Sequence, residues 1–230
     1  MTIDNLKKYL AEVKDKVDAT PKNGTEQRKL LKLKYSFSGQ SASEQLIIWD
    51  YIWNNSFDIW TCIQSFLYLE SNMKNKQFLL DSWETIKHWQ KSVVNWGMCD
   101  ALSKIYTKIL EIIPGEVLKQ LEQWNKSTNL WDRRQSVVGL LYFSRTKKVV
   151  LPYNTIIPFI NELIGDQEYY VQKGVGWALK ELYNVYPIET LRYLEDNIMR
   201  VSSTAFGAAT EKLKKEDKEK LIKIRKRSRQ

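Results

Sequence analysis

The chain of 230 residues contains a single histidine, His88, and two cysteines, Cys62 and Cys99. One histidine excludes a histidine-based catalytic triad and a multi-histidine zinc site, and two cysteines are too few for a cysteine zinc site. The sequence also lacks the glycine-rich motifs that hold the phosphates of nucleotides. We therefore expect no metal and no cofactor, a surface position for His88, and two reduced, partly buried thiols.

Long hydrophobic runs are absent as well. No stretch of about 18 uncharged apolar residues occurs, and residues 1–8 lack the apolar core of a signal peptide. Hydrophobic residues nevertheless make up 43% of the chain, which is enough for a sizeable core. These features predict a globular, cytoplasmic protein that does not enter a membrane.

Proline and glycine are also scarce, at 5 and 9 residues, whereas leucine, lysine, glutamate and isoleucine are frequent. This composition favours helices, and no convincing strand pattern is present. We expect an all-α fold in which residues 1–230 form a single domain, with a basic helix or tail over 213–230. The apolar periodicity predicts helices over 3–17, 25–35, 42–54, 57–71, 76–90, 93–113, 115–126, 130–145, 153–165, 168–185, 187–200 and 203–227.

Several of the predicted boundaries rest on capping and helix-breaking residues. Pro21 and Gly24 should end the first helix, and Thr25 should cap the second. The serine-rich stretch 36–44 should form a loop, with Ser41 or Ser43 as the next N-cap. The last helix is expected to break near Lys215.

A weak internal repeat accompanies this series of helices. Four segments lie near the start of the second helix of successive pairs, at intervals of about 35–40 residues, which is the period of HEAT-like repeats. Such repeats stack into a solenoid whose second helices line a concave groove. The segments are Asp58–Ile63, Trp96–Asp100, Trp131–Ser136 and Val171–Gly174.

The formal charge of +9 is unevenly distributed. Residues 212–230 contain ten Lys/Arg against three Asp/Glu, which leaves 26 against 24 in the rest of the chain. The body is therefore nearly neutral, and it can bind a polyanion only if the fold gathers basic residues on one face. The candidates at the repeat starts are Arg133, Arg134, Lys173 and Lys180.

The segment Tyr169–Glu181 combines an apolar helical stripe with two glycines, Gly174 and Gly176. Each glycine costs a helix roughly 0.5–1 kcal/mol relative to alanine, so something should approach the backbone closely. One interpretation is tight packing against a neighbouring helix. The other is a ligand backbone across the helix start, with Gln172 and Lys173 as donors and Trp177 one turn further on.

Trp96 and Asp100 are four residues apart and therefore lie on one helix face. Most of the 9 tryptophans must serve the core, so the tryptophan alone is a weak signal. A carboxylate in a basic groove would weaken binding of a polyanion unless it is paired with a base or used in chemistry.

The sequence resembles the AlkD-like DNA alkylation repair glycosylases, which are HEAT-like repeat proteins. The resemblance is best over Tyr170–Glu181, then over Asn129–Arg134, then at Trp96 and Asp100, and it extends from about residue 92 to 212. Lys180 stands where the family commonly has arginine. The resemblance implies that Trp96 and Trp177 are the groove tryptophans, Asp100 the catalytic aspartate and Arg134 a phosphate contact.

What the resemblance implies is a monofunctional glycosylase, active as a monomer on duplex DNA that contains cationic N3- or N7-alkylated purines. Its catalytic residues would be Asp100, Trp96 and Trp177. Its DNA-binding residues would be Arg134, Arg133, Gln172, Lys173 and Lys180. Two alternatives stay open: a non-catalytic HEAT-like module that binds branched or damaged DNA, and a solenoid that binds a protein partner.

Overall fold

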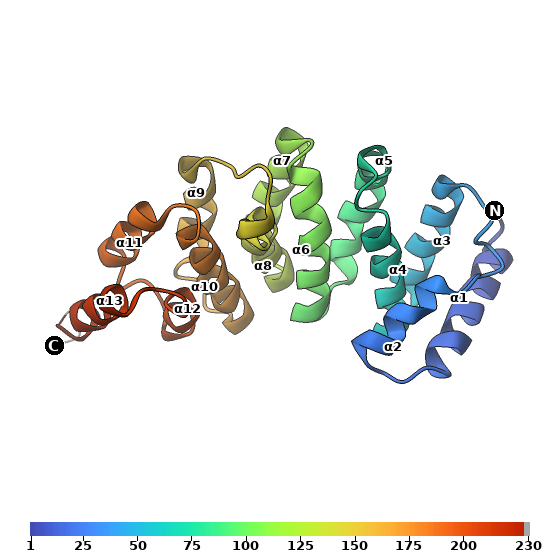
Figure 1. Ribbon diagram of the computed structural model, residues 1–230, viewed down its shortest axis with the longest axis horizontal. Coiled ribbons are helices and arrows are strands. Elements are labelled where there is room, and N and C mark those ends of the chain that lie inside the picture. Colours follow the sequence, from blue (N-terminus) through green and yellow to red (C-terminus); the bar gives the residue numbers. More distant parts are fainter. Residues whose placement is uncertain (228–230) are drawn as a thin grey trace. The chain divides into compact units, whose positions relative to one another are not determined.

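The computed structural model describes residues 1–227, and their regular structure consists of 13 α-helices and three short 3-10 helices, with no strand (Figure 1). The all-α fold class is thereby confirmed. The chain divides into two compact units, Met1–Val94 and Asn95–Gln230. The single-domain organisation stays a prediction, and residues 228–230 of the expected basic tail lie outside the described residues.

The first unit consists of five α-helices and two 3-10 helices around an aromatic core. Trp49 of α3 contacts the rings of Tyr35, Phe37 and Tyr68 at centroid distances between 5.3 and 5.7 Å. In the same unit Trp53 stacks on Trp89 at 4.8 Å. The elements are α1 (Ile3–Asp18), α2 (Gly24–Lys29), η1 (Leu30–Lys32), α3 (Ala42–Asn55), α4 (Ile59–Ser71), α5 (Lys76–Ile86) and η2 (Lys87–Ser92).

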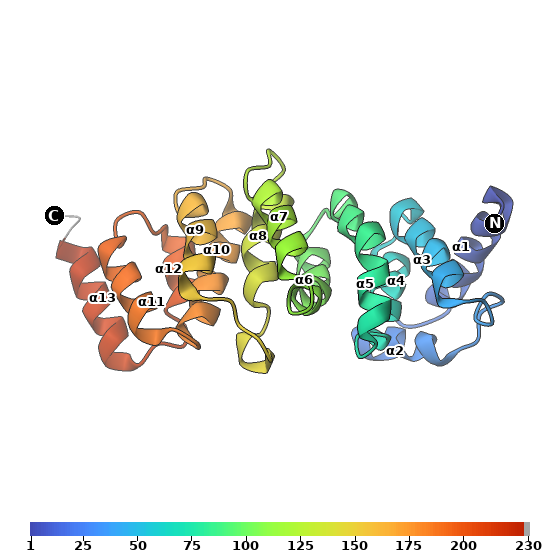
Figure 2. The same ribbon diagram turned by 90° about the horizontal axis from the view of Figure 1, so that it is seen from above.

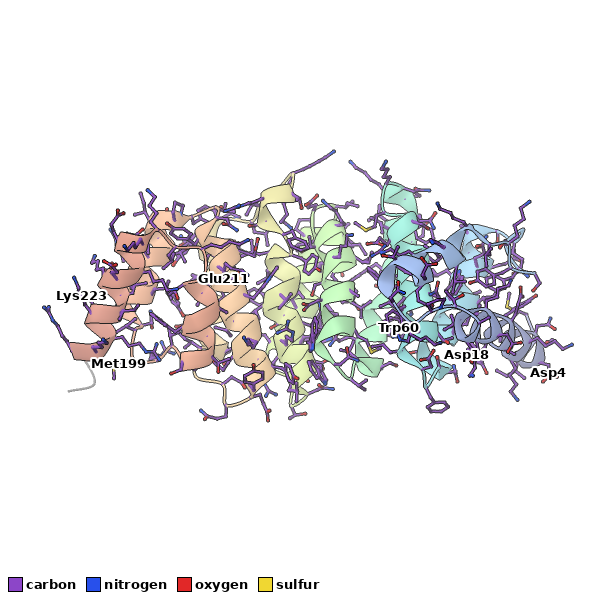
Figure 3. The ribbon with its side chains drawn as sticks, turned by 60° about the horizontal axis from the view of Figure 1, so that its bottom comes forward. Asp4, Asp18, Trp60, Met199, Glu211 and Lys223 are labelled. Carbon is purple, nitrogen blue, oxygen red and sulfur yellow. The ribbon has the colours of Figure 1, made fainter. Side chains whose placement is uncertain are left out.

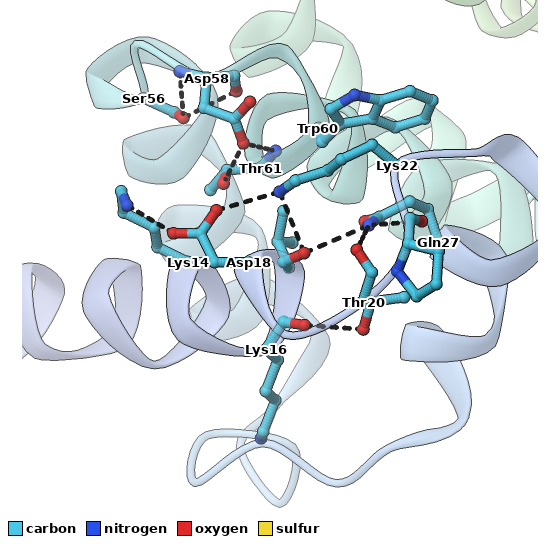
Figure 4. A network of polar contacts seen from close by, with 12 residues as sticks. Lys14, Lys16, Asp18, Thr20, Lys22, Gln27, Ser56, Asp58, Trp60 and Thr61 are labelled. Carbon is cyan, nitrogen blue, oxygen red and sulfur yellow. Dashed lines mark hydrogen bonds and ion pairs between the residues drawn. The ribbon is translucent and has the colours of Figure 1, made fainter.

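Polar contacts fix the turn between α1 and α2. Buried Gln27 donates from its amide nitrogen to the carbonyls of Val17, Thr20 and Pro21, and so satisfies the open end of α1 (Figure 4). On the surface, Asp18 pairs with Lys14 at 2.6 Å and with Lys22 at 3.0 Å. The turn thus holds α1 and α2 together through both buried and exposed groups.

Two of the predicted boundaries in this unit are corrected. Asn23, not Thr25, caps α2, because its side chain accepts from the backbone N–H of Glu26. Helix α2 ends at Lys29 and η1 at Lys32, before the predicted end at residue 35. The following Tyr35 and Phe37 are buried in the core. Ser41 is confirmed as the next N-cap, where it forms a capping box with Glu44.

The second unit is a two-layer stack of helices. Helix α6 packs against α8, α8 against α10, and α10 against α12, while α7 and α9 cover this row from one side (Figures 1 and 2). This is the arrangement expected of helical repeats. The elements are α6 (Trp96–Leu110), α7 (Pro114–Asn125), α8 (Leu130–Leu141), η3 (Ser144–Thr146), α9 (Tyr153–Leu163), α10 (Tyr169–Tyr183), α11 (Pro187–Asp196), α12 (Ser203–Ala209) and α13 (Lys215–Arg227).

Helix α8 ends four residues earlier than predicted because a buried carboxylate captures the chain beyond it. Phe143 adopts the left-handed conformation, with φ at 48°. The next residue, Ser144, donates from its backbone N–H and its hydroxyl to Glu181 Oε2 of α10, at 2.9 and 2.7 Å. The local sequence near Phe143 does not predict the contact of Ser144 with Glu181, which lies 37 residues further along the chain.

The two glycines of α10 mark close approaches within the protein. A Cβ on Gly176 would collide with the backbone oxygen of Ala205 and lie 2.8 Å from the Cβ of Ala208, so α12 rests directly on α10. A Cβ on Gly174 would lie 3.1 Å from Cγ of Arg134. Packing against neighbouring helices therefore accounts for both glycines.

The predicted break near Lys215 is confirmed, since α12 ends at Ala209 and α13 begins at Lys215. Leu221 anchors α13 in the core, and the buried Arg225 guanidinium lies 4.6 Å from the ring of Phe206. Lys223 lies on the exposed side of the same helix (Figure 3). The basic C-terminal helix is thus docked through one face, and its lysines stay in solvent.

The remaining sequence expectations concern isolated residues. Cys62 and Cys99 are free and buried, and burial raises the pKa of each thiol to about 12, so neither is a nucleophile near neutral pH. His88 is exposed. Within residues 1–227, no cluster of His, Cys, Asp and Glu could hold a metal ion, and no helix has the length and apolar character needed to cross a membrane.

Lys147 is an unusual buried cation in the connection after η3. Its side chain is only 1% exposed, and its Nζ lies 3.8 Å from Glu111 Oε1 and 3.5 Å from the carbonyl oxygen of Thr107. Burial lowers the pKa of Lys147 to about 8, and nearby Lys108 acts in the same direction. At neutral pH the Lys147 amine is therefore protonated although it is poorly solvated, which lowers the stability of the folded protein.

A Gly176→Ala substitution should reduce the free energy of unfolding by about 1–3 kcal/mol, because α12 must move away from α10. Gly207 lies in α12, and a Cβ added to it would meet no atom within 4 Å, so Gly207→Ala should be neutral or stabilise by up to about 1 kcal/mol. Urea denaturation of the two variants measures both effects. Equal effects would contradict the close approach.

A Lys147→Met variant should be more stable than the parent protein at pH 7, and this advantage should shrink by about 2 kcal/mol as the pH rises to 10. The folded pKa of Lys147 lies below the unfolded value, so the stability of the parent protein rises as the pH rises from about 8 to 10.5, and this gain is lost as the pH falls from 10.5 to about 8. Urea denaturation of both proteins at each pH measures the difference. A stability difference independent of pH would contradict the buried, depressed lysine.

Candidate functional site

Aromatic and charged side chains of the second unit line a cleft of about 400 Å³. Three of the predicted DNA-binding residues and both predicted groove tryptophans line it. The cleft lies over the starts of α6 and α10 and the end of α12. Its walls are formed by Trp96, Arg134, Tyr169, Tyr170, Lys173, Trp177, Lys180, Ala208 and Glu211.

The start of α6 supplies a tryptophan and, one turn later, a carboxylate. Asn95 caps the helix by accepting from the N–H of Met98, so the first residue, Trp96, projects from the helix end and is exposed. Asp100 lies on the same helix face, and its side chain is 28% exposed. The local sequence thus presents an indole and a partly solvated carboxylate together, as predicted from their spacing.

Arg134 of α8 is buried, with 6% of its surface exposed, and holds Asp100 in place. Its Nη2 donates to Asp100 Oδ1 at 2.7 Å, and its Nη1 donates to the backbone carbonyl of Tyr170 at 3.0 Å. A buried guanidinium without a counterion would be costly, so Asp100 and Arg134 stabilise each other. Asp100 is not among the residues that line the cleft, but it contacts Arg134, which does, and so it has the paired base that the sequence argument required.

Space for Arg134 comes from α10. The Arg134 side chain passes beside Gly174, where any larger residue would contact both its Cγ and its Nη1. The carbonyl of Tyr170, in the first turn of the same helix, accepts from the guanidinium. One short stretch of α10 thus provides both the space and the acceptor that fix the orientation of Arg134.

Trp177 stands one turn beyond Gly174 and is half-buried. Its indole lies 5.5 Å from the ring of Tyr142 and 6.4 Å from the ring of Phe143, between ring centroids. The left-handed turn after α8 brings these two rings against the indole. Trp177 is thereby held by aromatic neighbours while it still lines the cleft.

Two lysines and one carboxylate set the charge of the cleft. Lys173 is exposed, and Lys180 is mostly covered and pairs with Glu211 at 3.0 Å. Glu211, 59% exposed, follows α12 and is labelled in Figure 3. The hydrogen bond from Lys180 lowers the pKa of Glu211, with further contributions from the charges of Lys180, Lys212 and Lys173. The free cleft therefore contains an ionised carboxylate among several cations.

The other two predicted DNA-binding residues have structural partners instead. Arg133 donates from Nε to Asp166 at 2.6 Å and from Nη1 to the carbonyls of Ser127 and Thr128, so it points away from the cleft. Gln172 is buried, and its amide nitrogen donates to Leu163 O at 2.9 Å, while its side-chain oxygen accepts from Ser202. Arg133 joins two loops and Gln172 joins α9 to α12, and a DNA contact by either residue stays a prediction.

The sequence analysis did not assign three side chains that line this cleft, those of Tyr169, Tyr170 and Glu211. Tyr169 and Tyr170 line it from the first turn of α10, and a pair of aromatic residues beside Lys173 was a readable signal. Glu211 had no such signal, because its partner Lys180 is 31 residues away. The carbonyl of Tyr170 also contributes as an acceptor, which a sequence does not reveal.

Comparisons with known proteins identify the family of this chain. Residues 63–213 match the family model of the DNA alkylation repair enzyme. That segment spans more than half of the chain and contains the whole α6–α12 stack that builds the cleft. The chain belongs to the DNA alkylation repair enzyme family, as its resemblance to the AlkD-like proteins implied.

Two solved structures share the fold. The crystal structures of AlkD2 from Streptococcus mutans and of smu.31 from Streptococcus mutans UA159 match with TM-scores of 0.58 and 0.57, at 19% sequence identity. Each alignment covers 96% of this chain and 97% of the other. No curated protein matches the chain.

Asp100→Asn should lower the free energy of unfolding by about 1–2 kcal/mol, because it removes the counterion of a buried guanidinium. Glu211→Gln removes the same charge from a carboxylate that is 59% exposed and should change the stability by less than about 0.5 kcal/mol. Thermal and urea unfolding of both variants measures the contrast. A larger loss for Glu211→Gln would contradict the assignment of the buried pair.

Proposed function

We propose that this protein is a monofunctional DNA glycosylase that, as a monomer, excises cationic N3- and N7-alkylated purines from duplex DNA. The observation that carries the proposal is the carboxylate of Asp100, which is held by Arg134, a buried residue that lines the cleft together with two tryptophans. Membership of the DNA alkylation repair enzyme family supports it.

The reaction requires little acid catalysis. An N3- or N7-alkylated purine already carries a positive charge, so it leaves as a neutral base when the bond from its nitrogen to C1′ breaks. The sugar then acquires oxocarbenium character, and water adds to C1′ with loss of a proton. The products are the free alkylated base and an abasic site, and both DNA strands remain intact.

The side chains at the cleft match the charges of this reaction. The faces of Trp96 and Trp177 can attract a cationic base or sugar, an effect worth about 0.5–2 kcal/mol each. Asp100 stabilises the positive charge that develops on the sugar and can orient the attacking water. Arg134 donates a hydrogen bond to Asp100 Oδ1, and this contact fixes the orientation of the carboxylate. We therefore assign Arg134 primarily to positioning Asp100.

Cations at the cleft supply the contacts to the DNA backbone. Lys173 is available for a phosphate, and Lys180 becomes available when the phosphate replaces Glu211. Lys180 acts as a point charge and lacks the bidentate geometry of arginine. Binding should therefore depend strongly on salt.

A non-catalytic module that binds branched or damaged DNA is the second candidate. The observation in its favour is that Asp100 already has a structural role as the counterion of Arg134. In that case the carboxylate would stabilise the fold and take no part in chemistry. Base release separates the two candidates, because both predict DNA binding.

Asp100→Asn should slow the single-turnover release of 7-methylguanine from duplex DNA by about 10²-fold or more, since a preorganised electrostatic group is lost. The affinity for the duplex should hold or rise, because a negative charge leaves the cleft. Release is measured by chromatography of the free base, at a temperature at which the variant is folded.

The matched control is Asp196→Asn, which makes the same chemical change on the exposed surface of α11 and should leave the rate unchanged. A fully active Asp100→Asn variant would remove the catalytic assignment. Tight DNA binding without base release by the parent protein would favour the non-catalytic module.

A further inference from the structure

Three aromatic side chains form a continuous ledge beside the cleft. Trp131 of α8 lies 5.1 Å from the ring of Tyr170, and Tyr170 lies 5.2 Å from the ring of Tyr169, both measured between centroids. All three residues belong to the first turns of their helices. We call Trp131, Tyr169 and Tyr170 the aromatic ledge.

Exposure distinguishes Tyr169 and Tyr170 from most other aromatic residues of the protein, whereas Trp131 is half-buried. Trp49, Trp53, Trp83, Trp89 and Trp124 are buried. In contrast, Tyr169 is 55% and Tyr170 39% exposed, although their rings already contact each other. Adjacent exposed rings on a well-ordered helix start form a surface that remains apolar on its faces.

The protein holds the aromatic ledge rigidly to the candidate site. Asn129 accepts from the N–H of Trp131 at 2.8 Å and thereby sets the start of α8. The carbonyl of Tyr170 receives Arg134, whose other nitrogen binds Asp100. The guanidinium of Arg134 thus connects Tyr170 of the ledge to the carboxylate of Asp100.

Two cations lie near the Tyr169 end of the aromatic ledge, and the carboxylate of Asp166 lines the same second cleft as Arg200. Lys173 Nζ lies 5.9 Å from the centroid of the Tyr169 ring. Tyr169 also borders a second cleft of about 320 Å³, which Arg200 also lines. Exposed rings flanked by cations are the combination that binds unpaired nucleic acid, because the rings stack on bases while the cations contact phosphates.

We propose that the aromatic ledge is a stacking site for an unpaired nucleobase of DNA whose backbone occupies the neighbouring cleft. The inference rests on the DNA binding in the proposed function, but it does not require base excision. An unpaired base arises wherever a lesion or a missing base breaks pairing. The ledge would therefore favour duplexes with a disrupted pair over fully paired ones, without reading the sequence.

The test compares two duplexes at one fixed salt concentration. Both carry the fluorescent base 2-aminopurine at the same site, either paired with thymine or opposite a tetrahydrofuran abasic analogue. The parent protein should bind the second duplex at least about 10-fold more tightly. Its 2-aminopurine fluorescence should change on binding, as expected when the unpaired base is restacked.

The test variant is Tyr169→Leu/Tyr170→Leu, which keeps apolar bulk and removes the aromatic faces. It should lose most of the preference and the fluorescence change, while its dissociation constant for the paired duplex changes by less than about threefold. The matched control, Tyr169→Phe/Tyr170→Phe, keeps the faces without the hydroxyls and should retain the preference. The Phe control also covers the case in which the leucine variant fails to fold.

The outcomes separate this inference from the proposed function. A preference that survives the leucine changes, or is absent from the parent protein, overturns the stacking site even if 7-methylguanine is released. Loss of preference in the Phe control would assign the effect to the hydroxyls and overturn stacking as well. A ledge-dependent preference without base release would support the site and refute the glycosylase. Absence of DNA binding would overturn both.

Discussion

The contact between buried Arg134 and Asp100 is the constraint on which the cleft depends. A guanidinium with 6% exposure needs a counterion, and the N-terminal parts of α6 and α10 supply a carboxylate and a carbonyl for it. Three successive helices of the second unit, α6, α8 and α10, are thereby linked at one point. The positions of Trp96 and the aromatic ledge follow from this link, because they belong to the same helix starts.

Helix α10 makes this arrangement possible because two of its positions are glycines, which have no side chain. Gly174 leaves room for the Arg134 side chain, and Gly176 lets α12 approach the backbone. At the other end of α10, buried Glu181 binds Ser144 and stops α8 from continuing. The same turn brings Tyr142 and Phe143 against Trp177. Helix α10 therefore contributes several of the residues that line the cleft, and its Glu181 also fixes the turn that supports Trp177.

Periodicity and capping residues predicted nearly every helix, because those signals are local; Ser41 and the break before Lys215 are examples. Helix ends set by distant partners could not be predicted, as at Ser144 and at Tyr35. For the site, the spacing of Trp96 and Asp100 was informative, as was the family motif in α10. The intramolecular partners of Arg133 and Gln172 could not be predicted, because the sequence does not show which distant segment each side chain reaches.

The pairing of Lys180 with Glu211 also affects which anions can compete for the cleft. A tethered carboxylate 3.0 Å from the ammonium acts as a ligand at a high effective concentration, of the order of millimolar or more. A free phosphate or chloride ion must displace it with a single contact. A polymer that touches Lys173, Lys180 and other cations together distributes that cost over several contacts. If the cleft binds DNA as proposed, this ion pair would weaken the binding of a single small anion more than that of a long polyanion.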